Sequence, residues 1–291
     1  MAHIPVLLEE TIALLDPKSN ENFIDCTFGR GGHARVLLEK TAPKGIVIGF
    51  DMDGDSLADY KANNAVPDRL ILENLNFADI SRSEAVKSVV PISGILYDLG
   101  MSSWHIDESK KGFSFSKDEA LDMRYDRNDP VTAASIVNEK PAAELERIFS
   151  EYGEERDSRK IAKAIEAARR QKRIENAGQL AAIISKIAGP RQKNASLARI
   201  FQALRIAVNR ELENVERGIT GGFEVLAPGG RMAVITFHSL EDRIVKMKFR
   251  ELAAAGRARL INEKPTAPGG EETAINPRSR SAKVRAIEKI N

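Results

Sequence analysis

Ile24-Asp25-Cys26-Thr27-Phe28-Gly29-Arg30-Gly31-Gly32-His33 joins a short apolar run to an acidic residue and a glycine-rich turn. Apolar residues then recur at helical spacing from Ala34 to Lys40, which predicts a strand, a tight turn and the start of a helix. Glycine tolerates positive φ, and the first turn of a helix has free N–H groups, so a ligand can approach the backbone here. The segment is typical of the adenosine-binding edge of a parallel sheet.

A second acidic residue follows at the distance that such a site requires. Gly45-Ile46-Val47-Ile48-Gly49-Phe50-Asp51 has the pattern of a buried strand, and it ends in Asp51, 20 residues after Gly31. A carboxylate at the tip of the second strand can accept hydrogen bonds from both hydroxyls of a ribose. The turn and Asp51 together predict a nucleoside cofactor without indicating which one.

The composition is typical of a globular protein of one large domain or two. The chain has 291 residues, of which 42% are hydrophobic and 30% charged. No apolar run approaches the ~20 residues of a membrane helix, and the N-terminus lacks the pattern of a secretory signal. Cys26 is the single cysteine, which excludes an internal disulfide and a cysteine-based zinc cluster. We therefore expect a cytoplasmic protein without membrane attachment.

The net charge of +2 conceals a strong asymmetry along the chain. Residues 1–155 hold 16 Lys and Arg against 28 Asp and Glu, whereas residues 156–205 hold 13 against 3. Residues 277–291 add a second basic stretch, with 5 against 1. A solvated helical face could account for one such segment, but the clustering and its recurrence favour nucleic acid as a partner.

The first hundred residues alternate predicted strands and helices. Strands are expected at 23–28, 46–51, 70–75 and 94–100, with helices at 34–40, 56–63 and 81–89 between them. Repeated strand–helix units rich in Val, Ile and Leu predict an α/β fold with a doubly wound, mostly parallel sheet. Its ligand crevice should lie at the carboxyl ends of the strands.

Helical spacing replaces this alternation in the middle of the chain. We expect a first part of the sheet domain at 1–108, an inserted all-helical domain at 109–200 that carries the basic segment, and the second part of the sheet domain at 201–291. A long amphipathic helix over 197–215 is predicted to end before Gly221-Gly222. A turn at 226–230 then leads into a strand at 231–237.

The last two predicted strands indicate the type of sheet. Residues 259–263 and 283–288 alternate in polarity across a loop rich in Pro, Gly and Glu, so they should pair antiparallel. An antiparallel pair at the end of a parallel sheet is typical of S-adenosylmethionine methyltransferases. Gly29-x-Gly31-x-x-Ala34 nevertheless satisfies the dinucleotide fingerprint, so an NAD-dependent oxidoreductase remains an alternative. The antiparallel pair and Asp98 at the fourth strand tip count against it.

Three histidines, His33, His105 and His238, follow predicted strand ends, where ligands bind in open α/β sheets. No two of them have metal-ligand spacing, so no metal site is expected. After the fifth strand, Ser239 is the expected cap of the next helix, which leaves His238 available to the crevice.

Taken together, the motifs resemble those of one family, the bacterial 16S rRNA cytosine-N4 methyltransferases, over nearly the whole chain. The matching stretches are His3–Leu8, Thr27–His33, Asp98–Ser103, Gly112–Phe115, Leu121–Arg124, Tyr152–Arg156, Phe201–Ile206, Phe237–Arg243 and Asn276–Ser281. The family usually has glutamine where this chain has His105.

The resemblance implies a class I methyltransferase that uses S-adenosyl-L-methionine to methylate the N4 amine of a cytidine in 16S rRNA, in the decoding region of the small ribosomal subunit. It also implies the cofactor-binding residues. Gly31, Gly32 and His33 would contact the methionine part, Asp51 the ribose and Phe77 the adenine. Asp98 and His105 would complete that site.

The exocyclic amine of cytosine is a poor nucleophile, so the enzyme must accept hydrogen bonds from its two hydrogens as the nitrogen rehybridises. The Asp/Asn-Pro-Pro-aromatic motif of many amino-methylating enzymes is absent. Asp98 and the carbonyls of Leu99 and Gly100 occupy its place, which makes Asp98 the first catalytic candidate. His238 is the second, as a proton acceptor.

The basic segments supply the expected RNA contacts, because an unstacked target base must be held through its phosphates. These candidates are Arg124, Arg156, Arg159, Lys163, Arg169, Arg170, Lys172, Arg173, Arg278 and Arg280. An RNA-binding assembly factor that has a cofactor pocket but no turnover is a further alternative.

Overall fold

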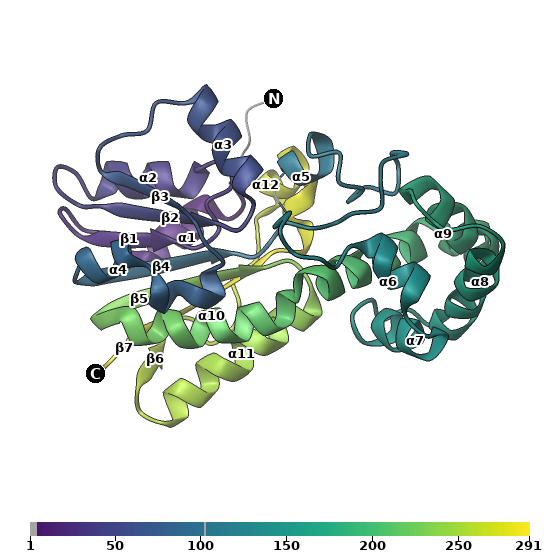
Figure 1. Ribbon diagram of the computed structural model, residues 1–291. Coiled ribbons are helices and arrows are strands. Elements are labelled where there is room, and N and C mark those ends of the chain that lie inside the picture. The colour runs from purple at the N-terminus through teal and green to yellow at the C-terminus, as the bar shows by residue number, and fades with distance from the viewer. Residues whose placement is uncertain (1–4, 102) are drawn as a thin grey trace. The chain divides into compact units, whose positions relative to one another are not determined.

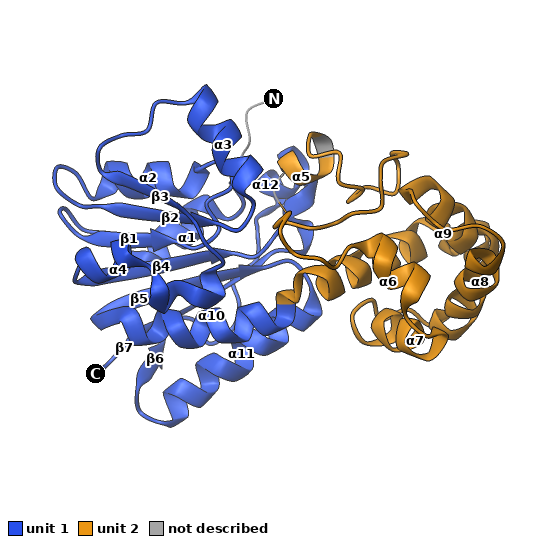
Figure 2. Ribbon diagram, viewed as in Figure 1, with its two compact units in different colours: residues 1–100, 212–291 blue, residues 101–211 orange. Residues whose placement is uncertain are grey.

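The computed structural model describes residues 5–101 and 103–291. His3, Ile4 and Ser102 of the motifs above lie outside the described residues. The chain forms two compact units, a sheet unit of residues 1–100 and 212–291 and a helical unit of residues 101–211 (Figure 2). The sequence predicted a helical domain at 109–200. The helical unit begins before the first of these residues and ends after the last.

The sheet unit contains one seven-stranded sheet in the order β3-β2-β1-β4-β5-β7-β6 (Figure 1). The strands are β1 (Asn22–Asp25), β2 (Val47–Asp51), β3 (Leu70–Asn74), β4 (Ile92–Asp98), β5 (Leu226–Thr236), β6 (Ala258–Leu260) and β7 (Lys283–Lys289). Strands β1 to β5 pair in parallel, and β7 is antiparallel to both β5 and β6. The predicted α/β class, the doubly wound sheet and the antiparallel C-terminal pair are confirmed.

Helices cover both faces of this sheet. On one face, α1 (Leu8–Leu15), α2 (Gly32–Lys40) and α3 (Gly54–Asn63) pack through leucines onto Phe23, Val47 and Leu96. On the other face, α4 (Glu84–Ser88), α10 (Glu211–Val225) and α11 (Ser239–Ala254) pack onto Ile24, Ile48 and Tyr97. Alternate residues of the strands therefore serve separate cores, which explains their nearly continuous apolar sequences. The shorter elements are η1 (Phe77–Arg82), α12 (Gly270–Ile275) and η2 (Pro277–Ser281).

The predicted end of a long helix before Gly221-Gly222 is wrong. The break occurs earlier, at Arg210, which has a φ of 49°, and α10 then continues through both glycines. Gly222 serves close packing, because a Cβ there would lie 2.3 Å from Tyr97 Oη. The same hydroxyl donates a 2.7 Å hydrogen bond to the carbonyl of Gly218, so α10 is held against the sheet at these small residues.

The strand β5 begins earlier than predicted and contains the expected turn. Its pairing with β4 shifts register between Ile92 and Gly94, which face Leu226 and Arg231, so residues 227–230 form an irregularity inside the strand. Gly229, with a φ of 78°, supplies the conformation that this irregularity needs.

The helical unit has a core of its own. Its elements are α5 (Ser103–Asp107), α6 (Ala133–Glu139), α7 (Ala142–Glu151), α8 (Ser158–Gln171) and α9 (Ala177–Asn209). Leu145, Phe149, Ile165 and Leu204 are among its fully buried residues. Helix α9 is kinked at Gly189, with a φ of 68° and a ψ of 167°, directly before Pro190. Among the described residues, no helix is long and apolar enough to cross a membrane.

Candidate active site

Three carboxyl groups lie at the carboxyl ends of three neighbouring strands. Asp25, Asp51 and Asp98 end β1, β2 and β4, and β1 lies between the other two strands in the sheet. Asp25 is aligned with Gly49 on one side and Leu96 on the other. The predicted ligand-binding edge of the sheet therefore presents three neighbouring carboxyl groups, which suits a cationic ligand.

The glycine-rich turn connects β1 to α2 and binds the end of β2. Gly29 and Gly31 have φ values of 53° and 69°, which only glycine adopts readily. The N–H of Gly29 donates to Asp51 Oδ2 at 3.1 Å. A Cβ on Gly31 would lie 2.7 Å from the Phe28 ring, and one on Gly32 would lie 2.4 Å from Pro5. Close packing therefore requires glycine at positions 31 and 32, and positive φ favours it at positions 29 and 31, independently of any ligand.

His33 lies in the first turn of α2 and is buried. Its Nε2 is 3.1 Å from the carbonyl of Val6. Because a carbonyl oxygen only accepts hydrogen bonds, Nε2 carries the proton. Nδ1 is then the ring nitrogen that points away from Val6. Nδ1 is 3.8 Å from Asp98 Oδ2, so His33 adjoins the carboxyl group of the first catalytic candidate.

Asp51 ends the second strand and Phe77 follows the third, and their predicted contacts with the cofactor stay predictions. Asp51 Oδ2 accepts from Gly29, and its Oδ1 accepts from the N–H of Asp53 at 2.9 Å, so the carboxylate is oriented by backbone. Phe77 begins η1 after β3, and its half-buried ring packs edge-on against Tyr97 at 5.5 Å. Both residues belong to the sheet unit.

Asp98 has the most unusual environment among the described residues of the sheet unit. Its N–H donates to Thr27 Oγ1 at 2.6 Å, while its own Oδ1 is buried and has no hydrogen-bond partner within residues 5–101 and 103–291. Burial, together with the charges of Asp25 and Glu241, raises the pKa of Asp98 to about 8, and a hydrogen bond from Gly100 opposes this rise. Such an oxygen is costly unless a ligand satisfies it.

Asp25 has a related environment but a different set of contacts. Its side chain is 2% exposed, and Oδ1 accepts from the N–H of Thr27 at 3.2 Å. Burial, together with the charge of Asp51, raises the pKa of Asp25 to about 7, and backbone hydrogen bonds from Thr27 and Ala34 oppose this rise. Two neighbouring carboxyl groups are therefore biased toward the neutral form, which a nearby positive charge would reverse.

His238 is the cap of α11, where the sequence predicted Ser239. The Nδ1 of His238 accepts from the N–H of Glu241 at 3.3 Å, and Glu241 in turn accepts from the N–H of His238. The other ring nitrogen, Nε2, lies 3.1 Å from Glu241 Oε1. Glu241 is buried, and its carboxylate also accepts from the N–H of Phe237 at 2.8 Å, so it fixes the backbone at the start of α11. The Nε2 of His238 forms no hydrogen bond with any described residue.

His105 belongs to the helical unit. It is buried among aromatic rings, with centroids 4.8 Å from Tyr125 and 5.4 Å from Phe113 and Trp104. Its predicted contact with the cofactor stays a prediction.

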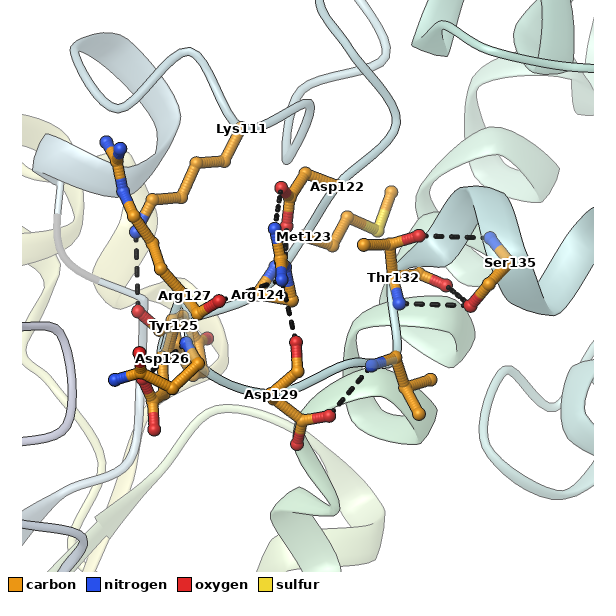
Figure 3. A network of polar contacts seen from close by, with 12 residues as sticks. Lys111, Asp122, Met123, Arg124, Tyr125, Asp126, Arg127, Asp129, Thr132 and Ser135 are labelled. Carbon is orange, nitrogen blue, oxygen red and sulfur yellow. Dashed lines mark hydrogen bonds and ion pairs between the residues drawn. The ribbon is translucent and has the colours of Figure 1, made fainter.

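Among the expected RNA contacts, Arg124 is the least available. Its Nε and Nη2 donate to the carboxylate of Asp122 at 2.8 and 2.9 Å, and Nη1 donates to the carbonyls of Arg127 and Asp129 (Figure 3). The side chain is 21% exposed. Arg124 therefore orders the loop between residues 122 and 129.

Arg169 is also engaged within the helical unit. Its Nη1 donates to the carbonyls of Val137 and Lys140 at 2.8 and 2.7 Å, at the end of α6. Arg170 and Arg173 are exposed and face Glu166 and Glu139 in surface ion pairs. The remaining candidates are exposed: Arg156, Arg159, Lys163 and Lys172 in the helical unit, and Arg278 and Arg280 in the sheet unit.

Two residues that contact or influence Asp98 and His238 were not predicted from the sequence. Thr27 positions Asp98 through its hydroxyl, and Glu241 holds His238 and raises the pKa of Asp98. Thr27 lies in the opening motif, so its position was the available signal. The buried state of Glu241 had no signal, because an acidic residue in the first turn of a helix is usually solvated.

Comparisons with known proteins agree along the whole chain. The model of the MraW methylase family matches residues 1–290. A protein of Thermomicrobium roseum named ribosomal RNA small subunit methyltransferase H is 44% identical, covering 99% of this chain and 94% of that protein. One of the same name from Elusimicrobium minutum is 45% identical, covering 99% and 98%.

A solved rRNA methylase from Streptococcus thermophilus aligns over 100% of both chains, at 11% identity and a TM-score of 0.44. With the family model matched from end to end and relatives above 40% identity over their full length, the chain belongs to the MraW methylase family.

Proposed function

We propose that this chain transfers the methyl group of S-adenosyl-L-methionine to the exocyclic N4 amine of a cytidine in 16S rRNA of the small ribosomal subunit. Membership of a methylase family and relatives named for small-subunit rRNA support the reaction type and the substrate class. The observation that carries the proposal is the unpartnered, buried Oδ1 of Asp98 at the end of β4.

The residues at the strand ends fit the cofactor. S-Adenosylmethionine supplies an electrophilic methyl group on a cationic sulfonium, and its methionine part adds an ammonium group. An edge with Asp25, Asp51 and Asp98, two of them with raised pKa values, is stabilised by such positive charge. Asp51 would hold the ribose, the turn at Gly31, Gly32 and His33 the methionine part, and Phe77 the adenine.

Asp98 is the proposed acceptor for the target amine, together with the carbonyls of Leu99 and Gly100. The N–H of Leu99 is fixed by a 3.0 Å hydrogen bond to the carbonyl of Ile235, and that of Asp98 by Thr27. This segment is therefore rigid, as an acceptor aimed at a transition state must be. His238 is less suited to take up a proton, since its Nδ1 lone pair already accepts from Glu241.

Methylation of isolated small ribosomal subunits from an unmodified strain tests the proposal. Labelled S-adenosylmethionine should transfer its methyl group to one cytidine, and mapping of the labelled base should place it on N4. Cofactor binding without transfer would instead support an RNA-binding assembly factor. Transfer to a base other than cytosine would contradict the proposed substrate.

A further inference from the structure

The helical unit contains a cleft of about 620 Å³ that the proposed reaction does not use. It is lined by residues 154–157, at the start of α8, and by Gln192, Ser196 and Arg199, in α9 after its kink. Its volume lies within the range of small-ligand sites. The cleft is thus large enough for one nucleotide.

Arg199 is held in this cleft by a buried acid. Glu155 is 3% exposed, and its Oε2 accepts from Nε of Arg199 at 2.8 Å and forms an ion pair with Nη2 at 2.8 Å. Nη2 also donates to Ser196 Oγ at 3.2 Å. Burial favours the neutral acid, but hydrogen bonds from Asp157 N–H, Arg199 and Ser196 outweigh it and lower the pKa of Glu155, so the pair is ionised.

This arrangement leaves one edge of the guanidinium for a ligand. Within residues 5–101 and 103–291, Nη1 of Arg199 has no hydrogen-bond partner, and the side chain is 34% exposed. A guanidinium fixed by a carboxylate behind it and open in front is suited to bind an oxyanion. Glu155 is accordingly a positioning residue for Arg199.

Arg156 adds a second cation to the same cleft. It is exposed and forms no hydrogen bond or ion pair with other described residues. The neighbouring acid, Asp157, is paired with Lys160 at 2.7 Å, which offsets its charge. The lining therefore offers two positively charged side chains and the exposed amide of Gln192. It also contains three acids, of which Glu155 and Asp157 are paired with cations and Glu154 is exposed at the rim.

Further basic residues continue from the cleft on both sides. Arg159 and Lys163 follow Arg156 on the exposed face of α8, at spacings of three and four residues. Arg191 and Lys193 flank Gln192 on α9 and are also exposed. A single small anion would need no such extension, whereas the phosphates of a polynucleotide would.

We propose that this cleft binds one phosphodiester-linked nucleotide of the substrate RNA, with Arg199 and Arg156 on the phosphate and Gln192 on the sugar or base. The proposal rests on the proposed function, because it takes rRNA as the substrate. It identifies a site in the helical unit that grips the RNA backbone separately from the cofactor edge of the sheet.

The test compares Arg156→Gln and Arg199→Lys with Lys186→Gln in the full-length protein. Lys186 is an exposed cation on α9 that forms no ion pair with another described residue and does not line the cleft, so it matches the charge loss. Thermal unfolding verifies that each variant folds. The readouts are KM and kcat for methylation of unmodified small subunits, the Kd for S-adenosylmethionine, and filter binding of a single-stranded oligoribonucleotide at several salt concentrations.

We expect both cleft variants to raise KM for subunits about tenfold while kcat and cofactor Kd stay unchanged. Arg156→Gln should also reduce the salt slope of oligoribonucleotide binding by about 0.7, the value for one phosphate on a single strand. Lys186→Gln should change KM by less than about twofold and should leave the salt slope unchanged. Equal effects of Arg156→Gln and Lys186→Gln on KM and slope would overturn the proposal.

Two further outcomes separate the cleft from the reaction. If the parent protein methylates no subunits, the proposed function fails, and oligoribonucleotide binding still decides whether the cleft is an RNA site. If calorimetry shows that inorganic phosphate binds the parent but not Arg156→Gln, while oligoribonucleotide binding is the same for both, the cleft is a free-anion site and the proposal is wrong.

Discussion

At the scale of single residues, the chemistry concentrates on carboxyl groups whose state depends on what is bound beside them. Asp98 and Asp25 have pKa values of about 8 and 7 because burial penalises their charge more than nearby N–H groups compensate it. A cationic cofactor would lower both pKa values, so binding and ionisation are linked.

That linkage predicts a pH-dependent affinity for the cofactor. As the pH rises from 6 to 9, the fraction of ionised Asp98 increases, so S-adenosylmethionine should bind more tightly. Calorimetry over this range should show a steeper gain for the parent than for Asp98→Asn, which removes the titrating group and retains the shape. Asp79→Asn, which changes a half-buried carboxylate of η1 that pairs with Arg217 on α10, is the control, and its profile should match the parent. Identical profiles for Asp98→Asn and the parent would contradict the assignment.

Asp98→Asn also tests the catalytic role of this group. The amide offers one acceptor oxygen but no negative charge, so turnover should fall far more than RNA affinity does. Single-turnover methylation at saturating cofactor measures this difference. If turnover is retained and only KM for the cofactor rises, Asp98 is a binding residue and His238 becomes the first catalytic candidate.

Asp51 is proposed to act in cofactor binding alone. Asp51→Ala should weaken S-adenosylmethionine binding by about 1–3 kcal/mol, the cost of leaving ribose hydroxyls without a charged acceptor. Calorimetry provides the measurement, and thermal unfolding shows whether loss of the hydrogen bonds from Gly29 and Asp53 disturbs the turn. Unchanged affinity in a folded variant would remove Asp51 from the site.

At the scale of elements, α8 carries the exposed basic face of the helical unit. Arg169 is a poor choice for mutagenesis of this face, because its side chain donates hydrogen bonds to carbonyls at the end of α6. Replacing Arg169 would disturb the end of a helix as well as the surface. Arg159, Lys163, Arg170 and Lys172 are exposed and are the better set to change.

Replacement of these four residues by glutamate should flatten the salt dependence of RNA binding. Each neutralised phosphate contributes about 0.7–0.9 to the log–log slope, so several contacts should be lost together. Cofactor affinity should be unchanged, because Asp51 and Asp98 lie in the sheet unit. Equal slopes in variant and parent would show a solvated face and transfer the RNA contacts to 277–291 or to the loops around 112–115.

The packing of α10 gives a second prediction at this scale. Gly222→Ala would place a Cβ 2.3 Å from Tyr97 Oη, which should destabilise the protein by about 1–3 kcal/mol as in other overpacked cores. Gly221→Ala is the matched control, since its Cβ meets only a side-chain methyl of Ile80 at 3.0 Å. Urea unfolding of both variants measures the difference. Equal stabilities would show that α10 shifts to accommodate the methyl group.

At the scale of the whole molecule, the two units differ in the charged residues that they present. The strand ends of the sheet unit present carboxyl groups, while the helical unit holds the basic residues of 156–205. A cationic cofactor and a polyanionic substrate are thus matched to different parts of the chain. The insertion between β4 and β5 makes this division possible without altering the order of the strands.

The raised pKa values also affect the stability of the unliganded molecule. Asp98 and Asp25 bind protons more tightly when folded than when unfolded, where the pKa is about 3.9. Their contribution to stability is therefore complete below about pH 4 and is lost as the pH rises through 7 and 8. Each can lower the free energy of unfolding by up to about 1.4 kcal/mol per pH unit.

Urea unfolding between pH 5.5 and 8.5 isolates this effect, because carboxyl groups with lowered pKa values, such as Asp122 and Asp242, are already ionised there. The parent should lose stability across this window, and Asp98→Asn should lose less. A parent curve that is flat or rises with pH would contradict the protonated state of this pair.

The sequence by itself determined the α/β class, the alternation in residues 22–98 and the reversed β7. It also placed Asp25, Asp51 and Asp98 at strand tips. All of these follow from local periodicity and from the direction of short connections, which neighbouring residues encode. The motifs, read in order, sufficed to indicate the family.

Only the tertiary structure decided which groups are free to act. Glu155 and Arg199 are 44 residues apart in sequence, and Tyr97 meets α10 across 121 residues, so neither contact has a local signature. The pKa values of Asp98 and Asp25 depend on burial by other elements, and the engagement of Arg169 depends on carbonyls at the end of α6, which is distant in sequence. Desolvation and long-range hydrogen bonding arise only when the chain is folded, which is why the positions of the three aspartates at strand ends were predictable and their chemical states were not.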